Sequence, residues 1–194
     1  MKQKNTNKII ELTTELCKEL GLDLSKPNFK DTPKRMTETY MGACKYDTKE
    51  AKQQLRESLK VTFPTKYKGM IIQEPIRVYS LCSHHLLPVT YDILFGYIVK
   101  DLSLGFSKSS KIFEILASHP VSQEDFTQEA VDLFTKALKP RGIFLVVRGL
   151  HYCMKIRSVK SDAINITSAV TGDFQKEEKS RMEFLSLAKF DVKD

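Results

Sequence analysis

Cysteine is scarce in this chain: four occur among 194 residues, and Cys17 and Cys44 stand far from the other two. So few thiols at uneven positions do not make a disulfide framework, and a reducing compartment is the simpler expectation. No apolar run reaches the length of a membrane span, and Glu11 and Glu15 interrupt the first apolar segment, unlike a secretory signal. We therefore expect a cytoplasmic protein with no membrane partner.

Internal repeats and low-complexity linkers are also lacking, and the composition fits one globular domain with some additional structure. Lys and Arg number 31 against 24 acidic residues, and the net charge of +7 favours an anionic partner. Nucleic acid and a small polyphosphate both qualify, although no basic patch interleaved with aromatic residues is present to stack bases. A basic surface that serves solubility alone is the remaining interpretation.

Apolar residues recur at helical spacing in six segments. Thr32, Ser107 and Ser122 are the expected N-caps of three of these helices, and Pro33 suits a first helical position. The expected helices cover residues 7–21, 32–41, 48–60, 107–118, 122–139 and 177–188.

Between the helices the period changes to that of strands. Two short strands separated by Pro75 are expected at 70–72 and 76–81, and others at 91–99, 143–157 and 167–174. Alternation over 143–157 predicts a core face and a polar face. The core face would carry Phe144, Val146, Leu150, Tyr152, Met154 and Ile156, and the polar face His151, Cys153, Lys155 and Arg157.

Thiol and imidazole side chains gather at two places, Cys82-Ser83-His84-His85 and His151-Tyr152-Cys153. Cys82, His85 and Cys153 together would make a Cys₂His set with an open fourth position, the pattern of catalytic zinc, which lowers the pKa of bound water. The odd spacing of Cys82 and His85 requires a turn. His151 would remain beside the metal as an acid or base. The alternative is that these are ordinary core or surface histidines and buried cysteines.

Charged residues lie at three helix starts. Lys108 and Lys111 share one face and could hold phosphate at a helix N-terminus, or they could simply be solvated. Arg35 lies in the first turn of an earlier helix, where a cation is mildly unfavourable. Glu124 lies in the first turn of another helix. Its negative charge suits the positive end of the helix dipole, and this alone can explain an acidic residue there without a functional role.

Several separated motifs resemble, in order and with similar spacing, those of the GTP cyclohydrolase I family. They are Cys82-Ser83-His84-His85-Leu86-Leu87-Pro88, Gly105-Phe106-Ser107-Lys108, Gln123-Glu124 and His151-Tyr152-Cys153-Met154. Asp31-Thr32-Pro33-Lys34-Arg35 and Arg181-Met182-Glu183-Phe184-Leu185 look like its flanking motifs. The resemblance covers about residues 31–188.

The resemblance implies an α+β tunnelling fold, an antiparallel four-stranded sheet with two helices on one face, preceded by N-terminal helices. We expect residues 1–60 to form the helical region and residues 61–194 the catalytic domain. The family also implies a homo-oligomer, typically a decamer, with sites at subunit interfaces, and Zn²⁺ held by Cys82, His85 and Cys153.

The implied reaction opens the imidazole ring of GTP, releases formate and recloses to 7,8-dihydroneopterin triphosphate. His84 and His151 would transfer protons, and Ser107 would relay protons while the ribose rearranges. Glu124 would hold the guanine edge with Gln123 beside it. The triphosphate would bind Lys108, Lys111, Arg157 and Arg35.

This chain departs from the family pattern at Ser83, Lys111, Asp125 and Ser158, and the first two bear most on the predicted site. Ser83 stands where the family usually has Glu, and Lys111 where it usually has Arg, so a bidentate phosphate contact is lost. These departures suggest one rival hypothesis, a sibling enzyme of the same fold acting on another purine or pterin. A second rival is a non-enzymatic, zinc-stabilised module that binds nucleic acid.

Overall fold

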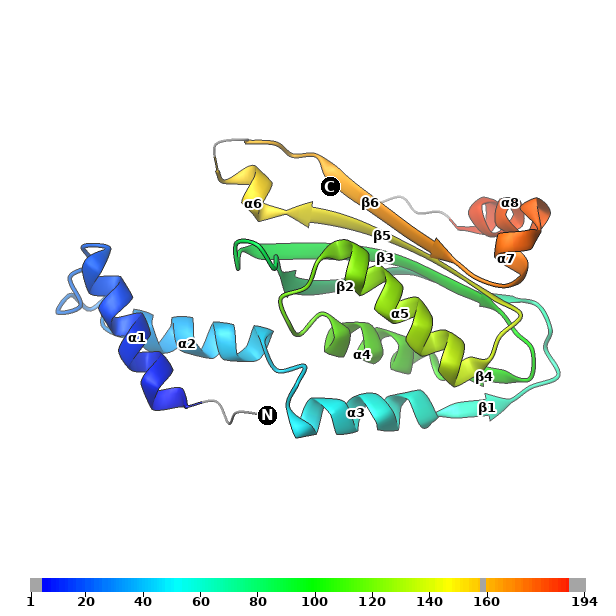
Figure 1. Ribbon diagram of the computed structural model, residues 1–194, viewed down its shortest axis with the longest axis horizontal. Coiled ribbons are helices and arrows are strands. Elements are labelled where there is room, and N and C mark those ends of the chain that lie inside the picture. The colour runs from blue at the N-terminus through cyan, green and yellow to red at the C-terminus, as the bar shows by residue number, and fades with distance from the viewer. Residues whose placement is uncertain (1–4, 158–159, 189–194) are drawn as a thin grey trace.

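A four-stranded antiparallel sheet forms the centre of the computed structural model, which describes residues 5–157 and 160–188. Its strands are β2 (Met70–Leu81), β3 (Pro88–Ile98), β5 (Gly142–His151) and β6 (Ile164–Val170), in the order β2-β3-β5-β6. Helices α4 (Phe106–Leu116) and α5 (Gln123–Leu138) connect β3 to β5 and cover one face (Figure 1). The predicted fold is therefore confirmed.

Three helices precede the sheet: α1 (Thr6–Glu19), α2 (Thr32–Ala43) and α3 (Lys49–Lys60). The first two pack on each other and extend away from the rest of the molecule (Figure 1). In contrast, α3 packs against α4 and contributes Ala51 and Leu55 to the main core. The boundary at residue 60 between a helical region and a catalytic domain stays a prediction.

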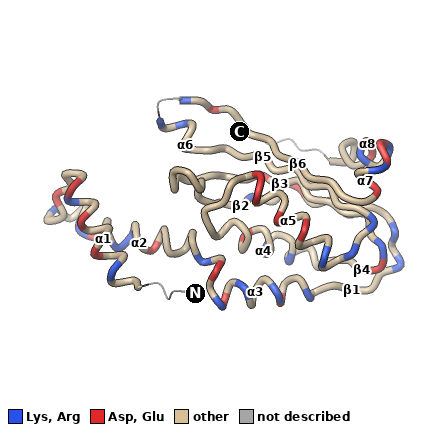
Figure 2. The backbone as a smooth tube through the Cα atoms, viewed as in Figure 1, with Lys and Arg blue, Asp and Glu red and all other residues tan. Residues whose placement is uncertain are grey.

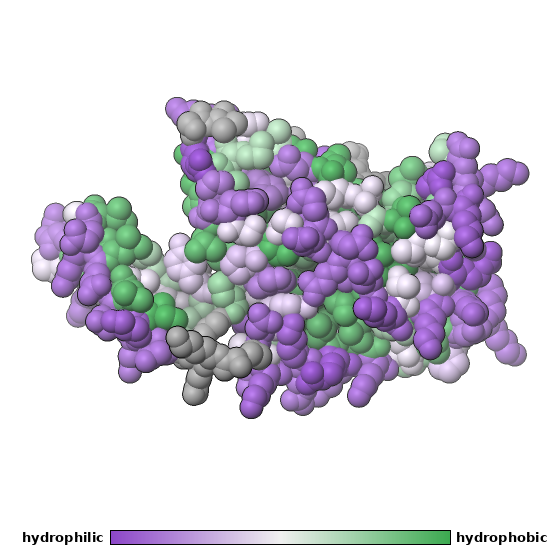
Figure 3. Space-filling model, viewed as in Figure 1, coloured by the Kyte–Doolittle hydropathy of each residue, from purple (hydrophilic) through white to green (hydrophobic). Residues whose placement is uncertain are grey.

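The extension formed by α1 and α2 carries apolar side chains on its surface, visible as green atoms in Figure 3. Leu12 and Leu16 of α1 and its C-cap residue Leu20 are exposed. Between the two helices the hydroxyls of Thr13 and Thr37 are buried and lie 3.0 Å apart. This pairing satisfies the polar groups inside the two-helix contact.

Residues 70–81 form one strand instead of the two short strands expected from Pro75. The pairing of β2 with β3 shifts its register between Gln73 and Ile76, so the chain passes the proline without ending the strand. An edge strand tolerates proline because one side of its backbone has no strand partner. A second, two-stranded sheet pairs β1 (Thr62–Pro64) with β4 (Leu102–Leu104).

The prediction for residues 143–157 was wrong in two respects. The strand ends at His151, and Tyr152–Lys155 form the short helix α6. The main core includes Ile143 and Leu145, while Phe144 packs on the opposite face against α7 (Asp173–Lys176) and α8 (Glu178–Leu187). Other elements cover both faces of this strand, so the residues that point to either face are largely apolar. The alternation of side chains along the strand therefore does not show which face belongs to the main core.

The last strand and the helix starts show smaller differences. β6 begins at Ile164 and ends at Val170, whereas the sequence indicated 167–174. Asp31 is the N-cap of α2 in place of Thr32, and Gly105 is the N-cap of α4 in place of Ser107; neither helix has a side-chain cap bond. The predicted cap at Ser122 is confirmed, because its side chain accepts a hydrogen bond from the amide of Asp125.

Candidate active site

A tight turn joins β2 to β3 and carries the first group of thiol and imidazole side chains. The carbonyl of Cys82 accepts hydrogen bonds from the amides of His85 (3.4 Å) and Leu86 (2.8 Å). The amide of Cys82 donates to the carbonyl of Leu87 at 2.9 Å, which closes the turn. Leu86 adopts a positive φ of 50°, as a reversal this tight requires. The expected turn after Cys82 is therefore present.

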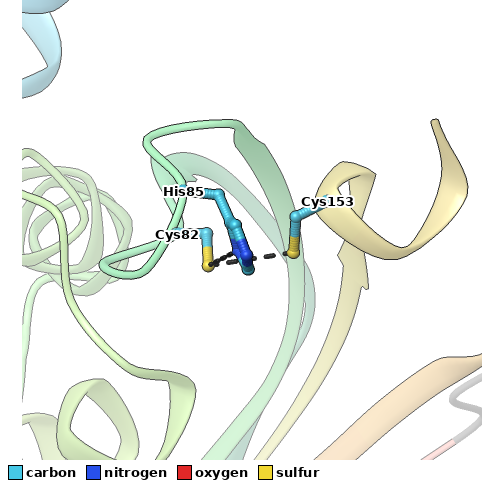
Figure 4. A group of neighbouring side chains, drawn as sticks. All are labelled: Cys82, His85 and Cys153. Atoms are coloured by element: carbon cyan, nitrogen blue, oxygen red, sulfur yellow. Dashed lines mark hydrogen bonds between the residues drawn. The ribbon is translucent and has the colours of Figure 1, made fainter. Parts of the chain in front are cut away.

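Cys82, His85 and Cys153 converge at one end of the sheet (Figure 4). Their ligand atoms all lie within 4.8 Å of one another, with the Cys82 sulfur 3.7 Å from His85 Nδ1 and 3.8 Å from the Cys153 sulfur. Zinc binds sulfur at about 2.3 Å, and two sulfurs in tetrahedral coordination then lie about 3.8 Å apart. The spacing of the three side chains therefore fits zinc.

His84 lies next to this group without joining it. Its Nδ1 is 3.8 Å from the Cys82 sulfur, but it is not among the atoms that come within 4.8 Å of one another. Cys153 joins because the chain leaves β5 and enters α6, not because it shares a strand face with His151. The three side chains expected to hold the metal do lie together, although the local structure that delivers Cys153 is different.

The crowding of these side chains shifts the pKa values of Cys153 and His85. Burial and the neighbouring Cys82 sulfur raise the pKa of the Cys153 thiol. Desolvation lowers the pKa of His85, and the charges of Arg157 and His84 add to that effect. His85 is thereby kept in the neutral form that binds metal, and a bound cation would stabilise the thiolate of Cys153.

A cavity of about 380 Å³ opens beside the metal ligands. Its walls include the start of α5, the end of β5 and two polar positions of β6. Of the predicted site residues, the following line it: Cys82, His84, His85, Gln123, Glu124, His151 and Cys153. One cavity therefore holds seven of the predicted residues, which is what a reaction centre requires.

His151 and Gln123 are bonded to each other on the cavity wall. His151 Nε2 lies 2.9 Å from Gln123 Oε1, and the Gln123 side chain is buried. Desolvation lowers the pKa of His151, while the charge of Glu124 acts in the opposite direction. The ring also meets the edge of Tyr91, with centroids 6.2 Å apart. His151 is thus held on two sides.

Three residues around His151 were missed in the sequence. Asn165 and Thr167 of β6 line the cavity, and Tyr91 of β3 is buried beneath it. Asn165 and Thr167 are two apart and so share a strand face, which was an available signal. Tyr91 had no such signal, because an aromatic residue in a strand is most simply explained as part of the core.

The predicted phosphate-binding residues lie mostly elsewhere. Ser107 and Lys111 line a separate cavity of about 620 Å³ along α4, together with Arg77. α4 starts just after β4, at the end of the sheet opposite the metal ligands (Figure 1). Lys108 is in its first turn, and Arg35 lies on α2 in an exposed ion pair with Asp31 at 3.6 Å. Only Arg157 is near the metal group, where its charge affects His85.

Basic and acidic residues alternate along much of the part of the chain that the structure describes. Lys and Arg are interspersed with Asp and Glu over several elements, as the blue and red segments of Figure 2 show.

Comparison with known proteins agrees with the geometry. The family model of GTP cyclohydrolase I matches residues 9–189. The chain belongs to the GTP cyclohydrolase I family. It is 35% identical to GTP cyclohydrolase 1 of Helicobacter pylori (strain HPAG1) over 180 residues, which cover 90% of this chain and 96% of that protein. The identity to GTP cyclohydrolase 1 of Methylococcus capsulatus is 35% over 178 residues, covering 91% and 94%.

A fungal member of the GTP cyclohydrolase I family is longer. The chain is 34% identical to GTP cyclohydrolase 1 of Neurospora crassa over 188 residues, 96% of this chain but 59% of that protein. Among solved structures, the apo form of the archaeosine synthase QueF-Like aligns with a TM-score of 0.40 and 11% identity over 52% of this chain and 93% of that one. That likeness is too low to bear on fold or function.

Membership in the GTP cyclohydrolase I family confirms the resemblance and the expectation of an enzyme. It does not by itself assign roles to single residues, which stay predictions. Within the described residues, every helix is too short or too polar to cross a membrane.

Proposed function

We propose that this chain hydrolyses GTP to 7,8-dihydroneopterin triphosphate and formate, using zinc held by Cys82, His85 and Cys153. The observation that carries the proposal is the tetrahedral spacing of these three ligand atoms inside a cavity that also contains Glu124 and His151. Family membership supports the choice of substrate.

The protein supplies binding and proton transfer around the metal. When bound, zinc lowers the pKa of water at its open position and so supplies a nucleophile at neutral pH. The carboxylate of Glu124 accepts hydrogen bonds from N1–H and N2–H of guanine, which orients the five-membered ring toward the metal side of the cavity. His151 donates a proton to the ring nitrogen as the C–N bond breaks, and His84 serves as the second proton-transfer group.

The triphosphate is bound by cations, and we propose that a second copy of the chain supplies several of them. Arg157 acts from the same chain as the metal ligands. Lys108, Lys111 and Arg35 lie on elements that reach beyond the metal cavity, and Ser107 accompanies them as a proton relay for the ribose rearrangement. This division supports a homo-oligomer with sites at subunit interfaces, of which a decamer is our specific proposal.

The remaining assignments follow from the proposed reaction. We place the enzyme in the cytoplasm, in the synthesis of folate and related pterins, with no nucleic acid or membrane as partner. Residues 61–194 would be the catalytic unit, and residues 1–60 would serve assembly.

The test is direct. Purified, zinc-loaded protein given GTP should release formate in equal amounts with neopterin triphosphate, which is fluorescent after oxidation. Absence of both products in metal-loaded, folded protein contradicts the proposal.

A sibling activity on another purine or pterin is the second candidate. It is favoured by Ser83, which lines the metal cavity where the family pattern has an acidic residue, and by Lys111 in the phosphate motif. A panel of purine nucleotides with mass detection separates the two candidates, because a sibling enzyme would convert another compound faster than GTP.

A further inference from the structure

The direction of the Gln123 side-chain amide is determined by its surroundings. Gln123 is 3% exposed, and its Nε2 donates to the backbone carbonyls of Val147 and Asn165, both at 3.0 Å, with Thr167 Oγ1 at 3.2 Å. Backbone carbonyl oxygens only accept hydrogen bonds. Turning the amide around would oppose oxygen to oxygen at two contacts and leave buried acceptors unpaired. The amide oxygen must therefore face His151.

The direction of this amide determines which nitrogen of His151 carries the proton. Gln123 Oε1 can only accept, so His151 Nε2, 2.9 Å away, must donate. A neutral imidazole has one N–H, and it is consequently on Nε2. Nδ1 makes no hydrogen bond with the rest of the described chain, and its lone pair is available.

We propose that Gln123 is a positioning residue that keeps the proton on His151 Nε2, so that Nδ1 is the nitrogen that exchanges a proton with the substrate. The part of this inference that concerns the reaction rests on the proposed function. It reassigns Gln123 from substrate binding, because a side chain this buried, with both amide ends bonded inside the protein, has no group left for guanine.

Gly149 makes the arrangement possible. It pairs with Tyr91 across β3 and β5, directly beside the amide. A Cβ at position 149 would overlap Gln123 Oε1 and approach His151 Nε2 to 3.1 Å. A side chain at position 149 would therefore push the amide oxygen away from His151. Such a substitution removes no polar group from the protein, because glycine has no side chain. This gives a second way to perturb the pair that does not remove Gln123.

The first experiment measures the tautomer directly. Zinc-loaded protein with ¹⁵N-labelled histidine rings has four imidazoles to assign, and His151→Asn identifies the signals of His151. The neutral wild-type ring should be protonated on Nε2. In Gln123→Met and in Gly149→Ala the two tautomers should mix or invert. Gln128→Met, an exposed position on the same helix that bonds Asp132, is the matched control and should leave the wild-type pattern.

Two results of the NMR experiment overturn the proposal. One is a wild-type His151 that carries its proton on Nδ1. The other is an unchanged tautomer in both Gln123→Met and Gly149→Ala. Because the measurement on the wild-type protein needs no GTP, it gives an answer even if the chain proves to act on a different substrate.

Kinetics then separate positioning from substrate binding. With Gln123 as a positioning residue, kcat for formate release should fall roughly 10²-fold in Gln123→Met, the lower end of what acid–base catalysis contributes, and KM should change little. Gly149→Ala should show the same division between kcat and KM. A raised KM with nearly normal kcat would contradict the proposal and return Gln123 to substrate binding.

Discussion

The cavity around Cys82 and the cavity along α4 differ in how their polar side chains are engaged. In the first, functional groups contact one another, as His151 and Gln123 do at 2.9 Å. In the second, two of the cations have carboxylate partners: Lys111 lies 3.0 Å from Glu114, and Arg77 donates to both oxygens of Asp92. The first cavity contains the proposed reaction centre, and the second contains ion pairs that are exposed or partly exposed.

This difference explains how one chain can hold both parts of the predicted site without bringing them together. Exposed ion pairs such as Lys111–Glu114 are worth about 1 kcal/mol or less, so a phosphate replaces the carboxylate at small cost. Breaking the buried hydrogen bonds of Gln123 would cost more free energy, because it would leave buried polar groups without partners. We therefore expect the proposed reaction centre to be held in place within one chain and the cations of α4 to be available to a neighbouring copy.

Removing a metal ligand should have the largest effect. Cys82→Ser replaces a thiolate with a poor zinc ligand, and the two remaining side chains do not make a stable site. Metal content after dialysis should fall to near zero, and formate release should be lost with it. Cys17→Ser changes a buried cysteine of α1 and should retain full metal content. Retention of zinc by Cys82→Ser would show that the metal is bound elsewhere.

Mixing inactive variants tests whether the two cavities act across a subunit interface. Cys82→Ser lacks the reaction centre, and the double variant Lys108→Ala, Lys111→Ala lacks the α4 cations. If a site takes its ligands from one chain and its cations from another, reassembled one-to-one mixtures should regain activity in about a quarter of the sites. A mixture no more active than its components would mean that each chain supplies its own cations.

The metal group was predictable because its chemistry is local and rare. Cys82 and His85 are three residues apart, and few side chains can bind a soft or borderline metal ion. The end of β5 was not predictable, because Tyr152, Met154 and Ile156 continue the strand alternation in sequence while the chain in fact turns into α6. That turn is needed to bring Cys153 to Cys82, a contact between residues far apart in the sequence.

The surroundings of Gln123 show the same limit. Its role depends on carbonyls of β5 and β6, 24 and 42 residues away, and no local pattern identifies those partners. The sequence indicated Gln123 only through its motif. The helices, most strands and the candidate ligands thus followed from periodicity and residue chemistry, and the fold class followed from the resemblance to a known family. The orientation of His151 depended instead on how distant strands align.

Replacing the carboxylate at the cavity mouth tests substrate recognition. Glu124→Gln loses a charged acceptor for guanine, and kcat/KM for GTP should fall roughly 10- to 100-fold, as expected for a hydrogen bond to a charged group. Inosine triphosphate, which lacks the 2-amino group, should show a smaller difference between wild type and variant. The neighbouring Asp125→Asn is the control and should leave kcat/KM close to wild type. Equal losses with both nucleotides would mean that Glu124 does not read the guanine edge.

The smallest expected effect compares the starts of α5 and α4. Ser122→Ala removes the hydroxyl that accepts a hydrogen bond from the backbone amide of Asp125. The free energy of unfolding should therefore fall by about 1 kcal/mol. Ser107→Ala should change it by no more than about 0.5 kcal/mol, because α4 begins at Gly105 without a side-chain cap. Urea unfolding of the two variants measures both values. A comparable loss in Ser107→Ala would mean that its hydroxyl stabilises the helix start after all, and its assignment as a proton relay would lose support.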